Sequence, residues 1–125
     1  MKIEFWIITF IAVVFTLATL TAFVFARTEA ANKQVLTDIT QIAQALKIYY
    51  DENGGYPAGQ GIPEGINLYL DQWPVPSLNG NCSAVPSYYY TPKFSENDFS
   101  IPFCLSEKTD DLSSGMHTLT SKGIN

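Results

Sequence analysis

The stretch "QVLTDITQIAQALKIYYDENGGYP", residues 34–57, predicts how the chain is built. Its hydrophobic residues recur at intervals of four, three, four and three positions: Val35, Ile39, Ile42, Leu46 and Tyr49. This spacing aligns them along one face of an α-helix. The polar residues fall mostly off that stripe: Asn32, Lys33, Asp38, Gln41 and Lys47. Because a helix with one apolar face must be covered, the rest of the chain is expected to supply a covering layer.

The helix is expected to end at Asn53-Gly54-Gly55, because Asn and Gly tolerate the left-handed conformation that terminates helices. Pro57 follows, as is usual after a helix end. In the other direction no Gly or Pro interrupts residues 27–50, so the helix can continue back to about Ile3. Fifty residues of helix are about 75 Å long.

Residues 5–26, "FWIITFIAVVFTLATLTAFVFA", contain no charged side chain. As a helix they are about 33 Å long, the thickness of a bilayer core. A segment that is apolar on every face favours a membrane span over the core helix of a small domain. A cleaved signal peptide is the alternative, with small residues near "FARTEA" as its cleavage site. Its apolar region would be shorter and its start more basic than Lys2 alone.

The two cysteines, Cys82 and Cys104, both lie in the C-terminal part. An even count beyond a membrane anchor indicates an oxidising compartment and a disulfide that closes a loop of about 23 residues. The alternative is a pair of reduced, buried thiols. Basic residues lie on both sides of the span, so the cysteines decide the orientation: N-terminus in the cytoplasm, C-terminal domain outside.

Composition and motifs exclude several classes of function. The net charge is −5 and no basic cluster exists, which argues against nucleic-acid partners. There is no nucleophile elbow, phosphate loop or CxxC motif, and His117 is the only histidine. We therefore expect neither an enzyme nor a cofactor.

Downstream of residue 87 the pattern becomes that of strands: "YYYT" at 88–91, "FSIPFCL" at 99–105 and "MHTLT" at 116–120. The middle run alternates apolar and polar residues and so predicts one buried face. The turn "SEND" should leave Glu96 and Asp98 solvated. Pro102 predicts an edge strand or a bulge.

The expected fold class is α+β, with one long N-terminal helix packed on a small antiparallel sheet. Residues 1–27 form the apolar half of the helix, residues 28–53 its amphipathic half, and residues 54–125 a loop followed by the sheet domain. The many aromatic residues are expected to fill the core between helix and sheet. A strand places neighbours on opposite faces, so at least one ring among Tyr88, Tyr89 and Tyr90 should be exposed.

The order of these features, and residues 38–57 above all, resemble the type IV pilin-like proteins, which include type IV pilins and the pseudopilins of type II secretion. The pattern "xxIQxALxxYYxDNGxYP" recurs there at the end of the long helix. The tail "FCLSEKTDDLSSGMHTLTSKGI" is also similar to that of some small pilin-like proteins. The resemblance implies a subunit of a cell-surface or periplasmic filament, anchored in the membrane until an inner-membrane platform assembles it.

The resemblance also implies roles for residues near the N-terminus. The family glutamate pairs with the N-terminal amine of a neighbouring subunit, which here points to Glu4 and Met1; a solvated Glu4 beside Lys2 is the alternative. Packing between subunits would involve Phe5, Trp6, Ile7, Ile11, Val14 and Phe15.

Maturation in this family removes a short basic leader that ends in Gly and then methylates the new N-terminus. Glu4 lies one place before the family's fifth position, and no Gly precedes the span. Two expectations stay open: an already trimmed form, or a protein that is not processed in this way.

Some pseudopilins bind calcium in a C-terminal loop, which makes Asp110 and Asp111, with Ser113, candidate ligands; a solvated turn is the alternative. For the chain as a whole, the leading hypothesis is a filament subunit. A single-pass anchored binding domain that never polymerises is the second hypothesis. The third is a secreted domain with ligand-binding loops between Gly54 and Asn81.

Overall fold

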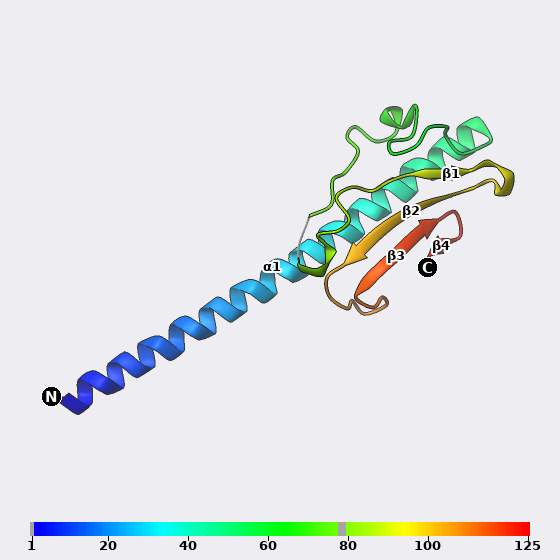
Figure 1. Cartoon of the computed structure of the whole chain (residues 1–125). Helices are drawn as coiled ribbons and strands as arrows, with labels where there is room; N and C mark the ends of the chain where they lie inside the picture. The colour runs from blue at the N-terminus through cyan, green and yellow to red at the C-terminus, as the bar shows by residue number, and fades with distance from the viewer. Residues whose placement is uncertain (1, 78–79) are drawn as a thin grey trace.

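The structure is a computed structural model that describes residues 2–77 and 80–125 (Figure 1). It consists of one long helix and a four-stranded antiparallel sheet that lies along the distal half of this helix, which confirms the predicted α+β class. The elements are α1 (Lys2–Asn53), β1 (Thr91–Lys93), β2 (Asp98–Leu105), β3 (Gly115–Thr120) and β4 (Gly123–Ile124), with short 3-10 helices η1 (Ile66–Leu68), η2 (Gly80–Cys82) and η3 (Phe94–Glu96).

Helix α1 is continuous over 52 residues, and its end is the predicted one. The N–H of Gly54 donates to the carbonyl of Tyr50 at 2.8 Å, and Gly54 has φ of 76°, in the left-handed region. Glycine adopts this conformation without a steric penalty. The turn directs the chain away from the helix axis and back along the domain.

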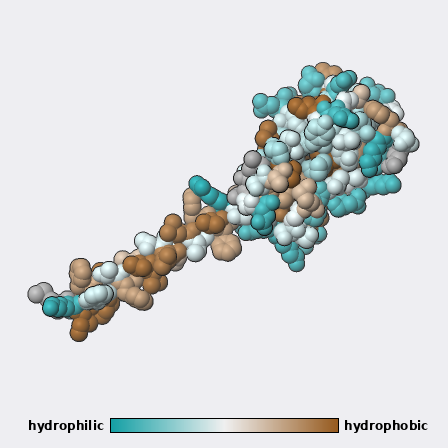
Figure 2. All heavy atoms as spheres, in the orientation of Figure 1, coloured by the Kyte–Doolittle hydropathy of each residue, from teal (hydrophilic) through white to brown (hydrophobic). Residues whose placement is uncertain are grey.

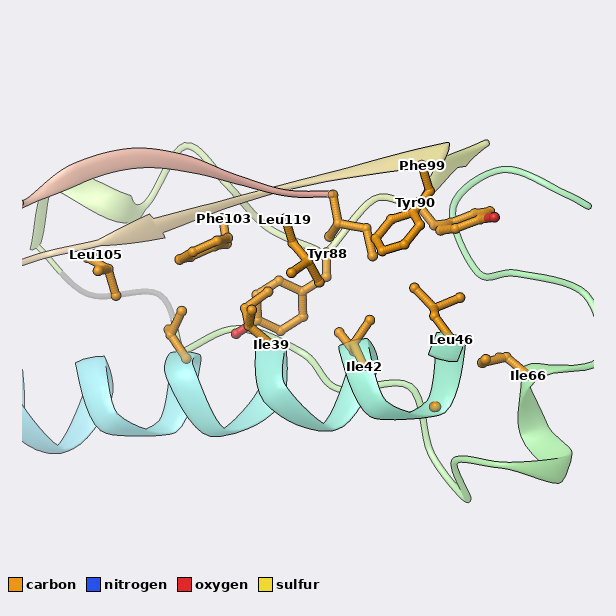
Figure 3. Close-up of a cluster of buried hydrophobic side chains, with 13 residues drawn as sticks. Ile39, Ile42, Leu46, Ile66, Tyr88, Tyr90, Phe99, Phe103, Leu105 and Leu119 are labelled. Carbon is orange, nitrogen blue, oxygen red and sulfur yellow. The ribbon is translucent and has the colours of Figure 1, made fainter. Parts of the chain in front are cut away.

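The core lies between the distal half of α1 and the sheet (Figure 3). Ile39, Ile42 and Leu46 point from α1 toward the sheet and are fully buried. From the sheet, Phe99, Phe103, Leu105 and Leu119 face the helix, and the buried Ile101 belongs to the same cluster. The predicted stripe is therefore confirmed from Val35 to Leu46, whereas Tyr49 at its end is only half-buried.

The sheet differs in detail from the expected one. Strand β1 begins at Thr91; before it, Tyr90 forms an isolated bridge with Gly61 through hydrogen bonds of 2.9 and 3.0 Å. The backbone of Tyr90 therefore pairs with the loop after α1 and not with β2. Tyr88 and Tyr90 are buried and Tyr89 is 47% exposed, which confirms that the run faces both ways.

Strand β2 lies between β1 and β3 in the order of the sheet but pairs with β1 over its first residues only, so the edge position expected from Pro102 holds locally at that residue. Pairing with β1 ends at Ser100, and Pro102 pairs with Thr118 of β3. No β1 residue lies opposite Pro102, so its missing N–H leaves no gap in that ladder.

Two polar residues expected off the apolar stripe are buried: Asn32 at 5% exposure and Asp38 at 4%. Asp38 Oδ2 accepts a hydrogen bond from the Tyr88 hydroxyl at 3.0 Å, and its Oδ1 accepts one from Gln34 Nε2 at 2.8 Å. Burial and the adjacent Asp38 carboxylate raise the pKa of Tyr88, so its hydroxyl keeps its proton and acts as the donor. Buried polar groups are tolerated because they are paired.

Asn32 joins α1 to the loop between β2 and β3. Its Nδ2 donates to the carbonyl of Glu107 at 2.8 Å, and its Oδ1 accepts from the N–H of Ser106 at 2.9 Å. The side-chain amide therefore satisfies one backbone donor and one backbone acceptor of the same loop. This contact fixes the height of the sheet along the helix.

The disulfide between Cys82 and Cys104 is present and links η2 to β2, as expected. The pair is separated by 22 positions and encloses Tyr88 and Tyr90, two of the largest buried side chains. Residues 83–90, between η2 and β1, belong to no strand apart from the bridge of Tyr90 to Gly61, so the crosslink restrains a part of the chain that backbone pairing does not.

Replacing Tyr88 by Phe should lower the free energy of unfolding by about 1–3 kcal/mol, because Asp38 Oδ2 loses its buried donor. Tyr89→Phe is the matched control: its exposed hydroxyl donates to Gln60 at 3.4 Å, so its removal should change stability by less than about 0.5 kcal/mol. Urea unfolding of the full chain in detergent micelles measures both. Equal effects would contradict the role given to the Tyr88–Asp38 contact.

Exchanging both cysteines for Ala should destabilise the domain by about 3 kcal/mol, the chain-entropy value for a loop of this size. The same unfolding measurement, with thermal melting as a second readout, checks this value. A double variant as stable as the parent would show that the segment between the cysteines is already ordered without the crosslink.

Candidate assembly surface

The proximal half of α1 forms a rod of hydrophobic side chains outside the domain (Figure 2). Fifteen large apolar side chains between Ile3 and Phe25 are at least half exposed. Within residues 2–77 and 80–125, α1 is the one helix long and apolar enough to cross a membrane, by length and composition. None of the domain residues that the structure describes covers this rod.

The residues expected to pack between subunits all belong to this rod. Phe5, Trp6, Ile7, Ile11, Val14 and Phe15 are each at least 50% exposed. Consecutive residues of a helix point about 100° apart, so Phe5, Trp6 and Ile7 face three directions. The surface is therefore apolar all round and suits an environment that surrounds the helix completely, either lipid or a bundle of helices.

The threonine hydroxyls of the rod are already satisfied inside the helix. Threonine hydroxyls donate to carbonyls three or four residues earlier, for example Thr9 to Phe5 at 2.7 Å and Thr21 to Ala18 at 2.9 Å. Thr16, Thr19 and Thr28 do the same. Because hydrocarbon offers no hydrogen-bond partners, this internal pairing makes the threonines compatible with a membrane interior.

Glu4 lies in the first turn of α1, where a carboxylate interacts favourably with the helix dipole. Among the described residues no side chain forms a hydrogen bond or an ion pair with it. Met1, the residue expected to pair with the glutamate of another subunit, lies outside the described residues. Glu4 is thus a carboxylate beside an apolar surface, a position that calls for a partner when water is removed.

The apolar rod ends where charged residues begin, at Arg27. The Arg27 guanidinium lies 4.3 Å from the centre of the Phe23 ring, and Lys33 pairs with Glu29 at 2.8 Å. The hydrogen bond and the charge of Lys33 lower the pKa of Glu29, and both side chains are exposed. Such pairs contribute little to stability, so these residues mark the polar boundary of the rod.

The calcium candidates Asp110 and Asp111 are exposed in the loop between β2 and β3. Within the part of the chain that the structure describes, no group of three or more His, Cys, Asp or Glu side chains comes together. His117 stacks on Phe103 with ring centres 5.6 Å apart, and its Nε2 lies 2.8 Å from the carbonyl oxygen of Ser113. Through these contacts the His117 side chain packs against β2 and binds the loop before β3.

Asp98 is not the solvated turn residue expected from "SEND". It begins β2, and its Oδ1 accepts hydrogen bonds from the N–H of Phe99 at 2.7 Å and of Ser121 at 2.8 Å. Burial alone raises the pKa of Asp98. The hydrogen bonds from Ser121 and Phe99 and the charge of Lys93 lower it by more, so the net shift is downward. Asp98 thus ties β2 to the turn between β3 and β4.

No protein-family model, curated protein or solved structure matches the chain. The likeness to type IV pilin-like proteins therefore remains an expectation from residues 38–57 and the order of the elements. The features of the structure that bear on function are the exposed apolar half of α1 and the polar residues at its two ends.

The role of Asn32 could not be predicted from the sequence, because a lone Asn on a helix gives no sign that a loop 74 residues away will bind it.

Asp98→Asn should destabilise the full chain at pH 7 by up to about 1 kcal/mol, because a neutral amide oxygen is a weaker acceptor on this partly exposed site. A lowered folded-state pKa stabilises the fold above the ordinary value of 3.8, and this contribution disappears as the pH falls through the folded-state value. The parent and the variant should therefore become equally stable in acid. Denaturation at pH 7, 5 and 3 measures this; a difference that stays constant over the range would contradict it.

Proposed function

We propose that this protein is a structural subunit of a filament of the type IV pilus or pseudopilus kind, held in the membrane by the proximal half of α1 and polymerised through the same surface. The observation that supports this most strongly is the uncovered apolar half of α1, which is rigidly continuous with a domain that covers only the distal half. Neither half has a loop in which the helix could fold back.

In this proposal the apolar half exchanges one apolar environment for another. Before assembly lipid surrounds it; afterwards the helices of neighbouring copies do. Lipid tails are as apolar as leucine, so close packing and polar pairing must supply the preference for the bundle. Contacts between unlike faces of identical subunits do not close on themselves and propagate into an open helical filament.

Glu4 is the residue on which polymerisation depends in this account. Its carboxylate would pair with the N-terminal amine of a neighbouring copy, in surroundings of low dielectric where an unpaired charge is costly. An anchor that only holds a domain at the membrane needs no such carboxylate. The non-polymerising anchored protein is therefore the alternative that the experiments below address.

The C-terminal domain would lie outside the cytoplasm, facing outward from the filament. The disulfide supports this placement, because such crosslinks persist in oxidising compartments. An inner-membrane assembly platform would be the partner that extracts the subunit from the bilayer.

Electron microscopy of sheared surface material, labelled with an antibody against the C-terminal domain, tests polymerisation in the native host. Labelled filaments are the expected result. Label confined to extracted membranes would favour the anchored, non-polymerising alternative.

Glu4→Ala should reduce the labelled filament material at least tenfold, because breaking a buried ion pair costs about 3–5 kcal/mol. The amount of protein in the membrane should not change, since the span itself becomes more apolar. Glu64→Ala, which removes an exposed carboxylate from the loop after α1, serves as the control and should assemble normally. Undiminished assembly of Glu4→Ala would remove Glu4 from the mechanism.

A further inference from the structure

A hollow of about 440 Å³ lies where the apolar half of α1 meets the domain. One wall is α1, with Phe25, Glu29 and Lys33, and the other is the loop between β2 and β3, with Glu107, Lys108 and Asp110. Figure 1 shows this loop at the end of the sheet nearest to the proximal half of the helix. The hollow is thus the part of the domain closest to a membrane that the helix enters.

The two walls are held in register by Asn32. Its amide binds the backbone of Ser106 and Glu107, directly before Lys108, at 2.9 and 2.8 Å. The loop therefore cannot move away from α1 without breaking two partly buried hydrogen bonds. The charged side chains of the loop are kept beside those of the helix.

The depth of the hollow matches the headgroup layer. If residues 5–26 fill the hydrocarbon, Phe25 lies at its outer edge, and the rise of a helix puts Glu29 about 6 Å and Lys33 about 12 Å further out. The polar layer on each side of a bilayer is about 5–7 Å thick. The Lys33 side chain reaches back toward the membrane, since its Nζ lies 2.8 Å from Glu29 Oε1. The charged groups of the helix wall therefore lie at the outer limit of the headgroup layer, while Phe25 faces the upper ends of the acyl chains.

Charges of both signs line the hollow. Lys33 and Lys108 supply two ammonium groups, and Glu29, Glu107 and Asp110 supply three carboxylates, so the net charge of these five side chains is −1. A purely anionic headgroup meets a net repulsion here. A zwitterionic headgroup finds an opposite charge for each of its own groups.

We propose that this hollow binds the phosphoethanolamine headgroup of a membrane phospholipid, an inference that rests on the membrane insertion in the proposed function. The phosphate lies toward Lys33 and Lys108, and the ammonium toward Glu107 and Asp110. A primary ammonium donates three hydrogen bonds to carboxylates, whereas the trimethylammonium of choline donates none. The site therefore selects ethanolamine over choline by hydrogen bonding and over glycerol by charge.

Native mass spectrometry of the detergent-solubilised full chain tests the site. Equal amounts of palmitoyl-oleoyl phosphatidylethanolamine, phosphatidylcholine and phosphatidylglycerol are added, and the fraction of single subunits that retain each lipid is measured. Retention of the ethanolamine lipid should exceed that of the other two by about three- to tenfold, as expected for a few partly exposed charged contacts.

The double variant Lys33→Gln/Lys108→Gln should reduce this retention to the level of the choline lipid. Lys47→Gln/Lys122→Gln is the matched control, since it removes the same charge, and Lys47 forms an equivalent pair with Asp51 at 2.7 Å on the distal part of α1. The control should retain the ethanolamine lipid as the parent does. Equal retention of all three lipids, or equal loss in both double variants, would overturn the proposal. Because single subunits are measured, the result does not depend on whether filaments form.

Discussion

The exposure of the apolar half of α1 is the constraint on which the rest of the structure depends. Fifteen large apolar side chains between Ile3 and Phe25 are at least half exposed. At about 1.5–3 kcal/mol for burying each one, leaving them in water would cost about 20–45 kcal/mol. A whole domain is stable by only about 5–15 kcal/mol. This half of α1 therefore needs an apolar environment that the domain, packed on the distal half, does not provide in this structure.

The distal half of the same helix shows how the domain is kept at a defined height above the apolar half. Ile39, Ile42 and Leu46 supply most of the apolar contact with the sheet, but apolar contact alone resists sliding only weakly. Asn32 and Asp38 add directional contacts, to the loop after β2 and to Tyr88 before β1. These contacts hold the base of the domain next to Glu29 and Lys33, and so create the charged hollow where the apolar half of α1 meets the domain.

The main architecture could be predicted from the sequence because it rests on periodicity and composition. The stripe from Val35 to Leu46, the helix end at Gly54, the alternation in β2 and the cysteine pair all carry local signals. What could not be predicted depends on partners far along the chain. Asn32 and Asp38 are polar, so the sequence predicts that they are exposed. Both are buried in the structure, where they form hydrogen bonds with Glu107 and Tyr88. Strand β4 has two residues, Gly123 and Ile124, too few for any periodic signal, and Asp98 is bound by a backbone N–H 23 positions away. The charged hollow could not be predicted for the same reason, since Lys33 and Lys108 line it together only because Asn32 binds the loop to α1.

The central claim, that helices of neighbouring copies cover the apolar half of α1, can be tested by photo-crosslinking in cells. A benzophenone amino acid in place of Phe15 reacts with whatever lies against the middle of the rod. We expect a ladder of covalent dimers and larger oligomers of this chain in the filament fraction, and lipid adducts of single subunits in the membrane fraction. Lipid adducts alone, with no crosslink between copies in any fraction, would contradict the claim.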